Sequence, residues 1–198
     1  MSERPIIVVS GFGRCGSSLV MQMLAAGGVP CLGDYPAFES RAMAKSGEAI
    51  KILDPHRANP TPYAIPPGAC VIWLDRDPSE QADSLVKFTR ILMGFSYNRE
   101  QRRALVRQLR ADREQAMRAI GTRPKMIVPF ESLLSTPAAW AKSIGAFVGL
   151  DGFDIIAAAG QVRLRSPKCA SGLDMELDLM GSRGNTTTTR DAPCQPAT

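Results

Sequence analysis

The sequence contains no long apolar run. No stretch of its 198 residues approaches the roughly 20 apolar residues that a membrane-spanning helix requires. The first apolar run, Ile6–Val9, is also shorter than the apolar part of a signal peptide, which has about 7–15 residues. Both absences argue against membrane insertion and secretion, so we expect a cytoplasmic protein without a membrane span.

Paired cysteines are absent as well. The sequence has five cysteines, an odd number, and no two of them have the Cys-x-x-Cys spacing of metal and redox sites. They are Cys15, Cys31, Cys70, Cys169 and Cys194. This pattern argues against a disulfide framework and a zinc site, as is usual for proteins of a reducing compartment. We therefore expect no metal.

The excess of positive charge is small. Lysine and arginine number 24 against 19 aspartates and glutamates, which gives a formal net charge of +5. This excess suits an anionic ligand, but it is too small to indicate nucleic acid, so we expect no nucleic-acid partner. Arginines are concentrated between residues 99 and 123 with acidic residues among them, which is typical of a helix with a solvated face.

Short apolar runs alternate with helical patterns along the chain. The predicted strands are Ile6–Val9, Ala49–Leu53, Cys70–Leu74 and Lys125–Pro129. The predicted helices are Ser17–Ala26, one that begins at the Asp77-Pro78 cap, Arg99–Ile120, and one from the Thr136-Pro137 cap to Gly149. This order predicts an α/β fold with a mainly parallel central sheet flanked by helices. We expect one domain over residues 1–181 and a disordered tail over residues 182–198, which are rich in threonine.

A glycine-rich loop, Gly11–Ser18, separates the first predicted strand from the first predicted helix. Backbone N–H groups and the positive end of the helix dipole converge at such a turn, and glycines let the backbone approach an anion closely. The candidate binding residues are Gly11, Gly13, Arg14, Cys15, Gly16, Ser17 and Ser18. The alternative is a strand–helix turn that binds nothing.

The loop departs from the ATP-binding pattern Gly-x-x-x-x-Gly-Lys-[Ser/Thr]. Gly11, Gly16 and Ser18 fit this pattern, but Ser17 stands where the lysine belongs, and Arg14 supplies a cation three residues earlier. Without that lysine, a nucleoside triphosphatase loses a contact to the transferred phosphate. The sequence therefore predicts a three-layer fold of the P-loop type with a phosphate site that is poorly suited to phosphoryl transfer.

A second candidate anion site follows the third predicted strand. Arg76 lies between the strand end and the Asp77 cap, and Ser84 lies in the second turn of the helix that follows. Helical side chains lean toward the N-terminus, so Ser84 and the Arg76 guanidinium can join around one phosphate. The alternative is that Arg76 pairs with Asp75 or Asp77.

These segments resemble the sulfotransferase family. Arg14–Ser18 is similar to the family's loop for the 5′-phosphosulfate of 3′-phosphoadenosine 5′-phosphosulfate (PAPS), and Arg76 with Ser84 is similar to its 3′-phosphate element. The segment from Ile127 to Leu150, with Phe130-Glu131 after a strand, also looks like a family segment. The resemblance implies PAPS as cofactor, PAP as product, no obligatory metal, and a small-molecule or glycan acceptor. It assigns the 5′-phosphate and bridging oxygen to Arg14.

The catalytic base is less clearly indicated. Sulfotransferases with a glutamate base place it at a comparable distance beyond the loop, which favours Glu39. Cytosolic members use a histidine, and His56, the only one here, is offset from the family's position. Asp54 follows a predicted strand, at the end where α/β sites gather. Lys51 is a candidate to assist the transferring group.

Two rival functions remain at the level of sequence. The first is a P-loop kinase for a nucleotide or small molecule, which predicts dependence on ATP and magnesium. The second is a non-catalytic protein of the same fold that binds PAP or another nucleotide. The family's basic, glycine-containing segment that closes over the nucleotide is not clearly present, although Arg163, Arg165 and Lys168 lie near the corresponding place.

Overall fold

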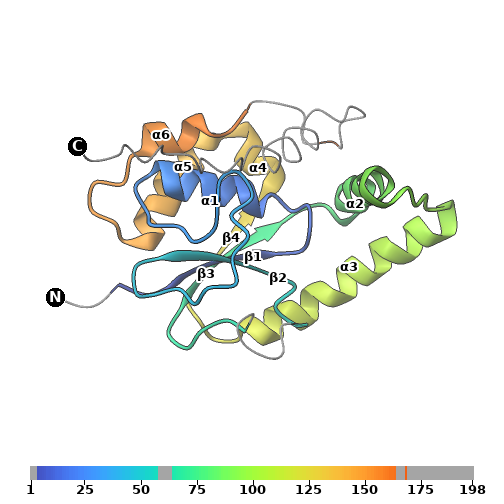
Figure 1. Ribbon diagram of the computed structural model, residues 1–198, viewed down its shortest axis with the longest axis horizontal. Coiled ribbons are helices and arrows are strands. Elements are labelled where there is room, and N and C mark those ends of the chain that lie inside the picture. Colours follow the sequence, from blue (N-terminus) through green and yellow to red (C-terminus); the bar gives the residue numbers. More distant parts are fainter. Residues whose placement is uncertain (1–3, 58–63, 164–167, 169–198) are drawn as a thin grey trace, which may run out of the picture.

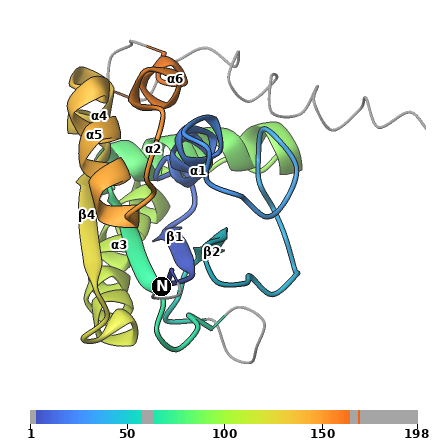
Figure 2. The same cartoon turned by 90° about the vertical axis from the view of Figure 1, so that its left-hand side faces the viewer.

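Four parallel strands form the central sheet. The computed structural model describes residues 4–57, 64–163 and 168. Its strands are β1 (Ile7–Gly11), β2 (Ala49–Leu53), β3 (Cys70–Asp75) and β4 (Lys125–Pro129). They lie in the order β2-β1-β3-β4, with β2 and β4 at the edges (Figure 2). All pairings are parallel, which confirms the predicted α/β sheet and its four strands.

Six helices complete the described part of the chain. They are α1 (Ser17–Ala26), α2 (Pro78–Met93), α3 (Arg99–Ile120), α4 (Phe130–Ser135), α5 (Pro137–Val148) and α6 (Ile155–Gly160). Helix α3 is on one side of the sheet, while α1, α4, α5 and α6 are on the other (Figure 1). The arrangement has the three predicted layers. No helix among the described residues is long and apolar enough to cross a membrane.

Alternating side chains of the inner strands fill two separate cores. Val9 and Ile72 belong to the core beneath α1 and α5, whereas Val8, Val71 and Trp73 belong to the core against α3. This division follows from the two-residue period of a strand, which sends successive side chains to opposite faces. Because both faces are covered, β1 and β3 read as continuous apolar runs in the sequence.

Side-chain hydrogen bonds mark the start of three of the six described helices, α2, α3 and α6. The Asp77 side chain accepts from the N–H groups of Ser79 and Glu80 at 2.9 and 3.0 Å, as an N-cap does. Thr136 is the N-cap of α5 and Pro137 its first residue, as predicted, but the Thr136 hydroxyl donates to the carbonyl of Ser132 at 3.0 Å and makes no cap hydrogen bond. The predicted tail, residues 182–198, and the end of the predicted domain lie outside the described residues.

Candidate functional site

The two predicted anion-binding segments meet at the carboxyl ends of β1 and β3. These strands are neighbours in the sheet, so the segments that follow them lie side by side. Arg14 Nε donates to Ser84 Oγ at 3.1 Å. Arg76 Nη1 donates to the carbonyl oxygen of Arg14 at 2.8 Å. The structure thus joins residues of the glycine-rich loop to Arg76 and Ser84, although 62 residues separate Arg14 from Arg76.

Two of the three loop glycines are required by their surroundings. Gly16 is the N-cap of α1 with φ of 100°, and a Cβ there would lie 2.6 Å from the Phe130 ring. A Cβ on Gly11 would lie 2.5 Å from the sulfur of Cys15. Gly13 is different, because its Cβ would make an ordinary 3.5 Å contact with Leu85. Sequence alone does not separate these three glycines.

Substituting Gly16 by alanine is expected to destabilise the protein by about 1–3 kcal/mol, because the change combines an unfavourable φ with a steric clash. The measurement is the free energy of unfolding from urea titration. Gly13→Ala is the matched control and should cost less than about 1 kcal/mol, since its new methyl group fits. Equal costs for the two variants would contradict this account of the loop.

Both arginines of the site stack on aromatic rings. The Arg14 guanidinium carbon lies 4.7 Å from the centre of the Phe88 ring, and that of Arg76 lies 4.6 Å from the centre of the Phe130 ring. Such stacking is favourable for a guanidinium and restricts its orientation. Arg76 is only 8% exposed, so its charge is fixed close to the loop. Neighbouring side chains therefore restrict the positions of both positive charges.

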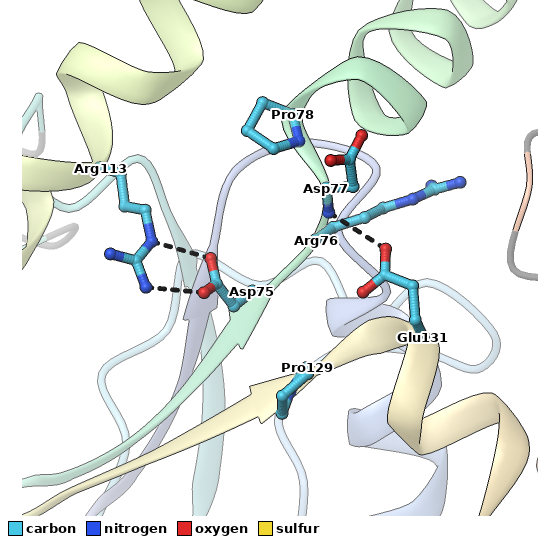
Figure 3. Close-up of a pocket in the computed structure, with 7 residues that line it drawn as sticks. All are labelled: Asp75, Arg76, Asp77, Pro78, Arg113, Pro129 and Glu131. Atoms are coloured by element: carbon cyan, nitrogen blue, oxygen red, sulfur yellow. Dashed lines mark hydrogen bonds and ion pairs between the residues drawn. The ribbon is translucent and has the colours of Figure 1, made fainter.

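The carboxylates beside Arg76 have other partners. Asp75 accepts two hydrogen bonds from Arg113, at 2.9 and 2.6 Å, and Asp77 caps α2. In Figure 3 the Arg76 side chain extends away from the Asp75–Arg113 pair. The alternative that Arg76 serves mainly as the ion-pair partner of Asp75 is therefore not supported.

A pocket of about 300 Å³ lies next to this element. It is lined by Asp75, Arg76, Asp77, Pro78, Arg113, Pro129 and Glu131 (Figure 3). Glu131 Oε1 accepts from the N–H of Asp77 at 3.0 Å, which ties the start of α4 to the start of α2. The pocket contains no residue of the glycine-rich loop.

The loop side chains other than Arg14 point into the protein or toward Lys51. Burial raises the pKa of the Cys15 thiol to about 11, with hydrogen bonds from Ser17 opposing the effect in part. Cys15 and Ser17 are both buried, so Cys15 has a neutral side chain that packs in the core. Its backbone N–H donates to Phe12 O at 3.1 Å and closes the turn.

Lys51 and Glu39 form an ion pair beside the loop. Lys51 Nζ lies 2.7 Å from Glu39 Oε1, and it also donates to Ser18 Oγ at 3.2 Å and to the carbonyl of Ala37. The Lys51 side chain is 2% exposed and that of Glu39 is 63% exposed. A buried ammonium group therefore holds an accessible carboxylate next to the start of α1.

His56 lies on the α3 side of the sheet, whereas Asp54 lies next to Gly11, the first residue of the loop. The His56 side chain is 6% exposed, 3.5 Å from Asp112 of α3, and accepts from Arg57 Nε at 3.1 Å. It contacts the Phe12 ring on the α3 side of the sheet, whereas Lys51 faces α1. Asp54 donates its N–H to Gly11 O at 3.0 Å, and burial raises the pKa of its carboxyl above the usual range. The structure does not bring His56 to the Lys51–Glu39 pair.

The sequence profile of the sulfotransferase family matches residues 55–154, which are 100 of the 198 residues of the chain. The chain belongs to the sulfotransferase family. The matched part of this family member contains Arg76 and Ser84, and it begins after the glycine-rich loop. No curated protein sequence matched the chain.

Solved sulfotransferase structures share the fold of this family member. Mouse sulfotransferase SULT7A1 complexed with PAP has a TM-score of 0.60 and 14% identity, over 82% of this chain and 66% of that one. Retinol dehydratase in complex with androsterone and inactive cofactor PAP has a TM-score of 0.54 and 12% identity, over the same shares. Sulfotransferase STF9 from Mycobacterium avium has a TM-score of 0.51 and 13% identity, over 93% and 77%. The chain thus spans just under two thirds of the first two proteins.

Glu131, in the third segment that resembles the family, contacts the start of α2. Of the basic residues considered for closure over a nucleotide, Arg163 and Lys168 are described and Arg165 lies outside the described residues. Sequence reasoning missed Gln81 and Phe88, which lie on the same face of α2 as Ser84. Gln81, Ser84 and Phe88 follow one another at intervals of three and four residues, and this helical spacing indicates that they share one face of the helix.

Proposed function

We propose that this protein is a PAPS-dependent sulfotransferase that transfers a sulfuryl group to a hydroxyl or amine of a small molecule or glycan. One observation carries the proposal. The glycine-rich loop and the Arg76–Ser84 element, which are far apart in the sequence, are joined by the Arg14–Ser84 and Arg76–Arg14 hydrogen bonds. Two anion-binding elements in contact suit a ligand with two anionic groups. PAP, bound in two structures of this fold, carries phosphates at the 3′ and 5′ positions of its ribose.

The residues present fit this ligand. The start of α1 and the glycine-rich turn supply N–H groups and a helix dipole for the 5′ group. The buried Arg76 and Ser84 supply a charge and a hydroxyl for the 3′-phosphate. Gly16 packs directly on the Phe130 ring, which leaves no room for a Cβ at this position.

PAPS supplies the sulfuryl group and leaves as PAP. The protein residues then have separate roles. Arg14 and the start of α1 stabilise negative charge that develops on the 5′-phosphate, as preorganised donors do. Glu39 accepts the proton of the acceptor hydroxyl or amine, since it is the accessible carboxylate beside the loop. Lys51 donates to both Glu39 and Ser18 and so fixes the position of the base relative to the loop.

Thermal unfolding with and without ligands tests the proposal. PAP without metal, at a hundred times its Kd, is expected to add about 2.7 kcal/mol of stability and to raise the Tm by about 5–10 °C. A response only to ATP with magnesium would point to a kinase instead. Stabilisation by PAP with no turnover of PAPS, whichever alcohols, phenols, amines and sugars are offered, would point to a non-catalytic nucleotide-binding protein.

A further inference from the structure

A buried amide on α2 reaches the backbone of the glycine-rich loop. Gln81 is 3% exposed, and its Nε2 donates to the carbonyl oxygen of Gly13 at 2.9 Å and to that of Phe12 at 3.4 Å. Arg76 Nη1 donates to the next carbonyl oxygen, that of Arg14, at 2.8 Å. Three consecutive loop carbonyls thus have donors from the side chains of the Arg76–Ser84 element.

Side chains on one face of α2 contact the glycine-rich loop. Ser84 Oγ accepts from Arg14 Nε, and Phe88 stacks under the same guanidinium. Leu85 lies next to Gly13. A buried amide is costly unless its hydrogen bonds are satisfied, and in Gln81 the donor atom is satisfied by loop carbonyls. The amide therefore fits this one loop conformation.

Fixing a carbonyl also fixes the N–H of the following residue. The peptide unit is planar and trans, so its C=O and N–H point in opposite directions. Gln81 holds the carbonyls of Phe12 and Gly13 toward α2, which turns the N–H groups of Gly13 and Arg14 away from α2. Backbone N–H groups in such a turn are the donors that bind an anion.

We propose that Gln81 is a positioning residue that presets the Gly13 and Arg14 N–H groups for the 5′-phosphate end of the nucleotide. The inference rests on the proposed function, because it assumes a nucleotide with a 5′-phosphate in the loop. It also gives α2 a second role, because the helix that carries Ser84 for the 3′-phosphate then orients the backbone that binds the 5′ group.

Isothermal titration calorimetry with three ligands tests this role. In Gln81→Leu, PAP and adenosine 5′-phosphate are expected to bind about 3- to 10-fold more weakly, the range for the loss of one neutral hydrogen bond. Adenosine 3′-phosphate should change by less than about twofold, because Arg76 and Ser84 are untouched. Gln81→Glu keeps the shape but turns carboxylate oxygens toward two carbonyls, so it should show the same selective loss, and a larger one.

Thr89→Val is the matched control on the same helix. Its hydroxyl donates to Leu85 O within α2, at 2.9 Å, so its loss should leave all three affinities within about twofold of the wild type. If the Gln81 variants bind all three ligands equally more weakly, or none of them more weakly, the positioning role is overturned. The proposed function would still stand in that case, provided that the wild type binds PAP. Failure of the wild type to bind PAP would overturn both.

Discussion

Arg76→Ala is expected to weaken PAP binding by about 10- to 150-fold, which corresponds to the 1.5–3 kcal/mol typical of hydrogen bonds to charged groups. The loss has two sources. The variant removes the guanidinium proposed to bind the 3′-phosphate, and it releases the carbonyl of Arg14, which Arg76 Nη1 holds at 2.8 Å. Calorimetric titration with PAP measures the effect. Adenosine 5′-phosphate should also bind more weakly, because the loop itself is disturbed.

Two further variants separate charge from geometry. Arg110→Ala removes one positive charge from the exposed face of α3, and PAP affinity should stay within about twofold. Arg76→Lys keeps the charge but loses the planar group that stacks on Phe130, so it should recover only part of the affinity. Wild-type affinity in Arg76→Ala would remove Arg76 from the site.

The sheet could be predicted because each strand carries its own signal. Cys70–Asp75 is an uninterrupted apolar run that ends in a charged residue, as expected for a strand buried on both faces. Helices α4 and α6 were missed because each has six residues, too few for a clear helical period. Packing stabilises them: Phe130 and Leu133 of α4, and Ala158 of α6, belong to the core beneath α1.

Which chain segments meet at the site could be predicted only in part. Glycine spacing and the position of Arg76 after a strand are local patterns, and parallel strands place the segments that follow them at one edge of the sheet. The partners of the side chains are not local. Glu39 and Lys51 both appeared as candidates, but their 2.7 Å ion pair depends on how the loop before β2 folds back over α1. The role of Gln81 could not be predicted, because the carbonyl groups that accept its hydrogen bonds lie 68 and 69 residues earlier in the sequence.

Glu39→Gln is expected to lower the rate of PAP formation from PAPS by about 10²- to 10⁴-fold, the usual contribution of a general base. The amide keeps the size of the side chain and an oxygen that accepts from Lys51 Nζ, but it cannot take a proton from the acceptor. Affinity for PAP should stay within about twofold, since Glu39 contacts Lys51 and not the loop backbone.

A matched control comes from the same connection between α1 and β2. Glu48 accepts from the N–H of Lys45 at 2.7 Å and lies outside the site, so Glu48→Gln should turn over at the wild-type rate. The initial rate is measured with an acceptor found by screening alcohols, phenols, amines and sugars. Full activity in Glu39→Gln would exclude Glu39 as the base. Asp54 would then be the next carboxylate to test, because its N–H donates to the carbonyl oxygen of Gly11 and the raised pKa of its carboxyl suits a base.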